Sequence, residues 1–375
     1  MKRLSALLFI IIVVSLGYVI ISNPDAVSSL LDKQKEIAQD LTPSSFEQEL
    51  TEDQQGKESS HINKEDSKED TSPPPQDLEG DSAAIASWIG QSSNEVIEKL
   101  GEPSRKDQTP YGYEWWIYPN ETNRYMQLGI LNEEVVSSYG VGDVQMQNIA
   151  TGDSYEEITS NRDIQNEVEV TNDRGSFQFR LSSDDKSRRP LLALENGNYA
   201  QLYFDTFKGT LSSIRIMNSE VLLRHRPYEV YYRGDLPEEP SLSREEWEVV
   251  EKGLEQQIFD ISNQIRNRFE EVELSWDDQV ASVAFGHSKD MAVDAYFAHV
   301  TPEGKGLKER LQANSIQYLS AGENIAAKYP DAPAVVEGWL NSKGHREALL
   351  HPNYTHLGVG VYEFHYTQNF IEKSS

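Results

Sequence analysis

The sequence predicts an α+β protein in which an N-terminal apolar segment and an acidic spacer lead into two folded regions of mixed helix and strand. Three observations predict this arrangement. Residues 4–21 form an apolar run, residues 40–82 almost lack large apolar side chains, and from residue 84 onward helical apolar spacing alternates with short β-branched and aromatic runs. A chain of 375 residues is long enough for two or three domains.

Charge and cysteine content exclude several kinds of function. The chain carries 62 acidic against 34 basic side chains, a formal charge of -28. Nucleic-acid binding needs Lys and Arg to contact phosphates, so we expect no nucleic-acid partner. The chain has no cysteine, which rules out disulfides, thiolate metal sites and cysteine nucleophiles.

Residues 1–22 are predicted to be an uncleaved signal-anchor, a single transmembrane helix. The apolar run is long enough to cross the hydrocarbon of a bilayer, and Lys2 and Arg3 before it predict a cytoplasmic N-terminus with the remainder of the chain extracellular. The alternative is a cleaved signal peptide and a secreted protein. A signal peptide normally has a shorter apolar region and ends at small residues, whereas this run continues into Asn23 and Pro24.

Residues 23–83 are expected to form a disordered acidic stalk. Their second half is dominated by Ser, Glu, Asp, Gln and Lys and contains three consecutive prolines at residues 73–75. Such a composition cannot bury enough apolar surface to offset the entropy lost on ordering.

Residues 84–232 are predicted to hold two copies of one small α+β unit. Two short patterns recur in the same order and at nearly the same spacing, residues 125–128 as 199–202 and residues 136–139 as 211–214. Matched pieces in matched order indicate an internal repeat.

Each copy is expected to be a helix on a small antiparallel sheet. In the first copy, Ser92 or Ser93 can cap a helix that Gly101 and Pro103 stop. Aromatic and β-branched residues then predict strands at residues 114–118, 124–131 and 135–141.

Residues 233–244 form a linker rich in Pro and Glu, and residues 245–373 are predicted to be helices around a small sheet. Apolar residues at intervals of three and four over residues 250–269 predict a long first helix. Shorter helices are expected after Asp277, Asp331 and Ser342, and strands at residues 357–362 and 366–371.

The C-terminal region carries eight ordered motifs: Asn263-x-x-Arg266, Leu274-x-Trp276, residues 284–291, Phe297-x-His299, Gly322-Glu323-Asn324-Ile325-Ala326, Trp339-Leu340-Asn341-Ser342, Gly344-His345-Arg346 and Gly358-Val359-Gly360. In order and spacing they resemble bacterial members of the CAP superfamily, which also holds cysteine-rich secretory proteins, insect venom antigens and plant pathogenesis-related proteins. Residues 89–103 are similar to the opening of the CAP-associated N-terminal domain of Gram-positive bacteria.

The resemblance implies an α-β-α sandwich, the CAP fold, with a surface cleft lined by two histidines and two acids. Carried over residue by residue, it assigns His299, Glu323 and His345 to this cleft. The fourth position departs from the family pattern, because Asn341 and Ser342 follow the helix Trp where many eukaryotic members have a second Glu. Glu337 lies one turn earlier, and no motif places it in the cleft.

Three kinds of chemistry are open to these residues. Two neutral imidazoles and a carboxylate suit a divalent metal such as zinc and leave a fourth place for water. Without metal, His beside Glu can act as an oriented general base. Alternatively, Glu323 only holds the cleft loops together. His287 is expected to be a buried core histidine, and Arg346 to pair with Glu323 or with an anionic ligand.

The sequence therefore favours an exported, membrane-tethered binding or structural module at the cell envelope, with an envelope protein or a wall ligand as partner. The alternative is a hydrolase of cell-wall or protein substrates that depends on a metal or on the His/Glu set. Lipid carriage, which the resemblance to some eukaryotic members also suggests, uses a segment that we cannot place in this chain.

Overall fold

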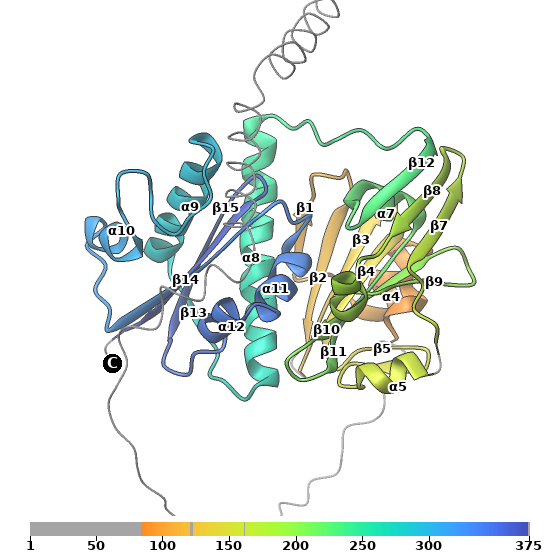
Figure 1. Cartoon of the computed structure of the whole chain (residues 1–375), viewed down its shortest axis with the longest axis horizontal. Helices are drawn as coiled ribbons and strands as arrows, with labels where there is room; N and C mark the ends of the chain where they lie inside the picture. The colour runs from red at the N-terminus through yellow and green to blue at the C-terminus, as the bar shows by residue number, and fades with distance from the viewer. Residues whose placement is uncertain (1–83, 121–122, 161, 374–375) are drawn as a thin grey trace, which may run out of the picture. The chain divides into compact units, whose positions relative to one another are not determined.

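The computed structural model describes residues 84–120, 123–160 and 162–373 (Figure 1). The predicted anchor, residues 1–22, and the predicted stalk, residues 23–83, lie outside this part of the chain. Among the described residues, no helix is long and apolar enough to cross a membrane. These residues belong to one compact unit.

The N-terminal region, residues 84–234, is built on a seven-stranded antiparallel sheet in the order β1-β2-β3-β4-β11-β10-β9 (Figure 1). Its two long hairpins meet at the centre, where β4 pairs with β11 and Tyr139 lies opposite Arg215. The strands are β1 (Arg105–Gln108), β2 (Glu114–Asn120), β3 (Arg124–Leu131), β4 (Glu134–Gly142), β9 (Leu191–Ala193), β10 (Tyr199–Asp205) and β11 (Thr210–Met217).

The repeated sequence patterns occupy matching strands of this sheet. Residues 125–128 and 199–202 lie on β3 and β10, and residues 136–139 and 211–214 lie on β4 and β11. Two separate small sheets were expected, whereas the strands of both halves join in one sheet. Pairing β4 with β11 removes two open strand edges, each of which would otherwise leave backbone groups unpaired.

Alternation along the strands gives the sheet two buried faces. Trp116 and Met126 point into a core closed by short elements: η1 (Ile85–Trp88), α4 (Ser93–Leu100), β5 (Gln145–Met146), β6 (Ile149–Ala150) and α5 (Tyr155–Ser160). Their neighbours Trp115 and Tyr125 point into a second core on the other face. The predicted helix α4 is confirmed, with Ser92 and Glu95 forming a reciprocal cap.

The second face is covered partly by a three-stranded sheet in the order β12-β8-β7. The elements of this cover are β7 (Glu167–Asn172), β8 (Gly175–Arg180), α6 (Ser183–Arg188), α7 (Ser219–His225) and β12 (Glu229–Gly234).

The C-terminal region, residues 244–373, has helices on both faces of a four-stranded sheet in the order β13-β15-β16-β14 (Figure 1). Gly358 and Gly360 let α9 lie directly on β15, because a side chain at either glycine would overlap the helix backbone. The elements are α8 (Arg244–Arg268), β13 (Ser275–Trp276), α9 (Asp278–Val293), α10 (Leu307–Ala313), β14 (Ser320–Ala327), α11 (Ala332–Leu340), α12 (Lys343–Leu349), β15 (His356–Tyr362) and β16 (His365–Glu372).

Helix α8 joins the two regions, because it packs on β15 and also on β1, β3 and β4. Its apolar stripe, including Leu254 and Ile258, shares one hydrophobic core with Trp115 of the N-terminal sheet and Trp339 of α11. The division of the chain into domains at residues 84–232, 233–244 and 245–373 stays a prediction. In the structure, one hydrophobic core continues across these boundaries.

Candidate functional site

The three cleft residues assigned by resemblance come from different elements of the C-terminal region. His299 lies in the loop after α9, Glu323 lies on β14, and His345 lies on α12. Strand β14 pairs with β16 so that Glu323 faces Asn369 across the ladder. The site is therefore anchored on the sheet, with both histidines presented by segments that pack beside it.

Glu323 is the centre of a dense set of hydrogen bonds. Its side chain is only 4% exposed. Arg310 Nη2 donates to both carboxylate oxygens, at 3.0 Å to Oε1 and 2.8 Å to Oε2. With its amide turned so that both ends are satisfied, Asn369 donates to Oε2 at 3.0 Å. Both oxygens are thus already engaged by donors.

His299 is oriented by this carboxylate. Its Nδ1 lies 2.9 Å from Glu323 Oε1, and its side chain is 37% exposed. Burial alone would raise the pKa of Glu323, but the hydrogen bond from His299 and the charge of Arg310 outweigh it and hold the pKa below its usual value. An ionised carboxylate can only accept, so Nδ1 carries the proton and Nε2 is the acceptor or basic nitrogen of the neutral ring.

His345 is half-buried beside these groups. Asn324, the next residue on β14, donates from its side chain to the backbone oxygen of His345 at 3.1 Å and so links α12 to the sheet. Burial, with a smaller contribution from the charge of His299, lowers the pKa of His345 to about 4. Of the three assigned residues, His299 and Glu323 are in direct contact, and His345 is linked to the site through its backbone oxygen and through the charge of His299.

Two further residues lie at this network: Arg310, which sequence reasoning missed, and His287, whose Nε2 lies 4.0 Å from Glu323 Oε1. Arg310 lies on the short helix α10, where a charged residue is usually a solvated one, and it also donates to His299 O at 3.0 Å. His287, expected as a core histidine, is buried on α9, and its Nε2 donates to Ala298 O at 3.0 Å. Burial lowers the pKa of His287 to about 4.

The donor set fits a hydrogen-bond network better than a metal centre. Within the described residues, no group of three or more His, Asp or Glu side chains is arranged to hold a metal ion. A zinc ion on Glu323 would have to displace Arg310, a cation already bonded to both carboxylate oxygens.

Arg346 does not pair with Glu323, so that expectation is wrong. Its guanidinium binds Asp205 of β10 through two parallel hydrogen bonds of 3.0 and 2.9 Å. It also lies over the rings of Phe207 and Phe269. The partner is far away in sequence and belongs to the N-terminal region, which local motif spacing cannot reveal.

Glu337 also faces the N-terminal region. It is buried, and its Oε1 accepts hydrogen bonds from Ser212 at 3.0 Å and Ser213 at 2.5 Å on β11. Within the described residues its Oε2 has no hydrogen-bond partner. Burial raises the pKa of Glu337 to about 7, despite the two serine hydrogen bonds.

A buried ion pair completes the contact between the regions. Arg215 of β11 donates to both oxygens of Asp331, at 2.7 and 2.8 Å, and both side chains are almost fully buried. Asp331 also caps α11, the helix that carries Glu337. Three ionisable groups of the C-terminal region, Asp331, Glu337 and Arg346, therefore bond to residues of the N-terminal sheet.

Comparison with known proteins agrees with this two-part organisation. Residues 89–228 match the family described as CAP-associated N-terminal, and residues 259–371 match the cysteine-rich secretory protein family. The chain is 42% identical over 292 residues to the uncharacterized membrane protein YlbC of Bacillus subtilis, a match that covers 78% of this chain and 84% of that protein.

Solved structures show the same architecture. An extracellular protein with an SCP domain from Bacillus anthracis superposes with a TM-score of 0.75 at 40% identity, over 81% of this chain and all of that one. A cysteine-rich secretory protein from Staphylococcus aureus superposes with a TM-score of 0.69 at 23% identity, over 77% of this chain and 93% of that one, which supports the fold alone.

Proposed function

The chain belongs to the CAP family of cysteine-rich secretory proteins, in its Gram-positive form with a CAP-associated N-terminal domain, and from that premise we propose that it is a binding module held at the outer surface of the cell membrane. Residues 1–22 would be the anchor and residues 23–83 the stalk. The description of YlbC as a membrane protein and of the Bacillus anthracis structure as extracellular supports this location. Secretion after signal cleavage is the alternative.

The observation that carries the binding role is the saturation of Glu323. A carboxylate bonded to Arg310 and His299 holds the cleft rigidly and has little capacity left to take part in a reaction. In the segment that carries His299, Phe297 and Val300 expose 41% and 50% of their surface. Exposed apolar side chains around a fixed polar group favour capture of a ligand, such as a wall fragment or a segment of an envelope protein.

A hydrolase is the second candidate, and one observation favours it. His299 is held by a carboxylate at Nδ1, the arrangement in which a histidine acts as an oriented general base. A metal-dependent version with zinc on His299, Glu323 and His345 is less favoured, because Arg310 occupies the carboxylate.

One experiment separates the two functions. The full-length protein is incubated with purified cell-wall sacculi, and both retained protein and released soluble fragments are measured. Binding without release, weakened by His299→Gln and unchanged by the control His356→Gln on β15, is the expected result. Fragment release that disappears in His299→Gln would overturn the binding proposal in favour of hydrolysis.

We also propose that the N-terminal domain arose by duplication and serves as a platform for the CAP domain. The recurrence of two sequence patterns on β3–β4 and on β10–β11 supports the duplication. The platform role is supported by its contacts with Asp331, Glu337 and Arg346, all of them on or beside α11 and α12.

A further inference from the structure

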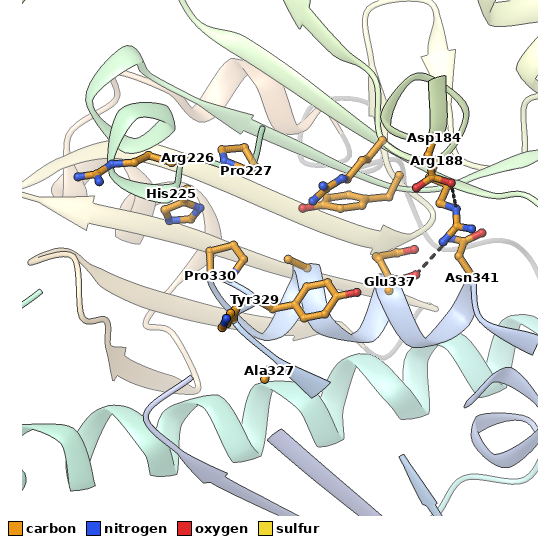
Figure 2. A pocket seen from close by; sticks show the side chains of 15 residues that line it. Asp184, Arg188, His225, Arg226, Pro227, Ala327, Tyr329, Pro330, Glu337 and Asn341 are labelled. Carbon is orange, nitrogen blue, oxygen red and sulfur yellow. Dashed lines mark hydrogen bonds and ion pairs between the residues drawn. The ribbon is translucent and has the colours of Figure 1, made fainter. Parts of the chain in front are cut away.

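A cavity of about 340 Å³ lies between the two domains (Figure 2). The N-terminal domain contributes the end of α6 and residues 225–227, and the CAP domain contributes residues 327–330 and one side of α11. Neither His299 nor Glu323 lines it, so this cavity is separate from the site around Glu323 described above.

Positive side chains converge on this cavity although the chain as a whole carries a charge of -28. Arg188, Arg189, Arg226 and Lys328 line it, against two acids, Asp184 and Glu337. Arg226 is already paired, because its Nη1 lies 2.6 Å from Glu239, an acid outside the cavity lining. Gathering the other three cations in one pocket is unfavourable unless an opposite charge compensates them.

The compensation within the protein is weak for the two arginines of α6. Arg188 pairs with Asp184 and Arg189 pairs with Asp185, each at 2.8 Å and each one helical turn apart. Such partly exposed pairs contribute only about 0.3–0.5 kcal/mol, so a ligand oxyanion can replace or share them. The planar guanidinium groups suit the two oxygens of a carboxylate or phosphate.

The opposite wall supplies groups for the remainder of a ligand. Tyr329 lies against α11 at Gly338, where a side chain would overlap the tyrosine ring. Asn341 borders the same wall near Arg188 (Figure 2). A volume of about 340 Å³ exceeds that of a bare phosphate ion and is at the lower end of the range for small-molecule sites.

We propose that this interdomain pocket binds a small organic oxyanion, a molecule of about the size of a hexose phosphate or citrate, with its anionic group on Arg188, Arg189 and Lys328. Because both domains form the walls, the bound anion ties the N-terminal domain to the CAP domain. The chain then resists unfolding more strongly when the anion is present.

The test uses the full-length chain and three probes, glucose 6-phosphate, citrate and inorganic phosphate, with glucose as the neutral control. Calorimetric titration is expected to show saturable binding of glucose 6-phosphate or citrate at millimolar concentration or below, and no binding of glucose. Whichever of these two anions binds more tightly shows whether the pocket prefers a phosphate or a carboxylate. Weaker binding of inorganic phosphate than of the organic anions is expected, because it fills less of the pocket.

The double variant Arg188→Gln, Lys328→Gln is expected to weaken the organic anion about tenfold or more, as the loss of charge-assisted hydrogen bonds does elsewhere. Both side chains are partly exposed, so the thermal transition of the free protein should be nearly unchanged. The matched control is Arg180→Gln on β8, whose arginine has a similar exposed pair with Glu167.

The proposal is overturned if none of the three anions binds, if inorganic phosphate binds as tightly as the organic anions, or if Arg180→Gln weakens binding as much as the double variant. His299→Gln should leave anion binding intact, so failure of the cleft proposal and failure of this one are separate results.

Discussion

At the scale of single residues, the cleft depends on how one carboxylate is shared. Glu323 accepts from a histidine, an arginine and an amide, and its side chain is almost fully buried. A buried carboxylate in such a network is costly to alter, because each partner loses a charge-assisted hydrogen bond.

Replacement of Glu323 by Gln is therefore expected to destabilise the protein. The amide keeps the shape but turns a donor toward Arg310 or His299, and the lost charge-assisted bonds cost about 2–3 kcal/mol. Urea unfolding of the variant measures this loss. The exposed Glu347 on α12 provides the control, since Glu347→Gln should change the free energy of unfolding by no more than about 0.5 kcal/mol. An equal loss of stability in the two variants would contradict the network.

Glu337 should make stability depend on pH in the opposite direction from an ordinary ion pair. Its pKa is raised from 4.5 to about 7, chiefly by burial, so the folded chain binds its proton more tightly than the unfolded chain does. Its contribution is fully present below pH 4.5 and is lost as pH rises through about 7. Arg268 and Asp205 are the charged groups that act on it.

The variant Glu337→Gln removes this titration. Its free energy of unfolding should equal that of the parent near pH 5 and exceed it by roughly 1–3 kcal/mol at pH 8. Denaturant titrations at both pH values measure the difference. A constant difference across this range would mean that Glu337 does not titrate there.

At the scale of elements, local signals in the sequence predict helices well. The cap at Ser92 and the stop at Gly101 predicted α4 at its observed position. The apolar stripe over residues 250–269 predicted α8, which begins earlier, at Arg244, because Ser243 and Glu246 form its cap. Caps and stripes act over a few residues, so they can be read without knowing the tertiary structure.

The contact between α9 and β15 gives a prediction for the motif Gly358-Val359-Gly360. A Cβ at Gly360 would overlap the backbone of Phe285, so Gly360→Ala should cost about 3 kcal/mol or prevent folding. Thermal unfolding monitored by circular dichroism measures it. Gly286 lies on the same helix with open space around it, and its change to Ala should be neutral or stabilise by up to about 1 kcal/mol.

At the scale of the whole molecule, the sequence could not show which residues connect the two domains. Arg346 and Glu337 are read as residues of the CAP domain, and their partners Asp205 and Ser213 lie more than a hundred residues away. The role of Arg310 was missed although Glu323 lies only 13 residues further along the chain, because the pair joins a helix to a strand and follows no helical or strand spacing. Contacts between distant segments leave no local pattern in a single sequence.

The buried pair Arg215 and Asp331 should be the most sensitive point of the domain contact. Asp331→Asn keeps the capping oxygen of α11 but leaves a buried guanidinium without its counter-charge, which costs about 3–5 kcal/mol. Asp184→Asn, which breaks the exposed pair with Arg188, should change stability by less than about 1 kcal/mol. Chemical denaturation measures the free energy of unfolding of both variants. Similar losses in the two would show that the buried pair Arg215–Asp331 adds little to stability.

The docked arrangement finally predicts how the CAP domain behaves by itself. From the sequence, residues 243–375 are expected to fold alone with a cooperative transition. In the structure, however, Asp331, Glu337 and Arg346 depend on the N-terminal domain, and α8 contributes apolar side chains to the shared core. Removing these partners should lower the melting temperature of the isolated region by roughly 10 °C or more, since each kcal/mol lost is worth several degrees in a domain of this size.

Scanning calorimetry of residues 243–375 beside the full-length chain tests this. We expect one cooperative transition for each, with that of the isolated region at the lower temperature. The variant Asp331→Asn supplies the link between the two measurements, because it should destabilise the full-length chain and have little effect on the isolated region, where Arg215 is absent. Equal melting temperatures, or an equal effect of Asp331→Asn in both, would mean that the CAP domain gains no stability from the sheet on which it rests.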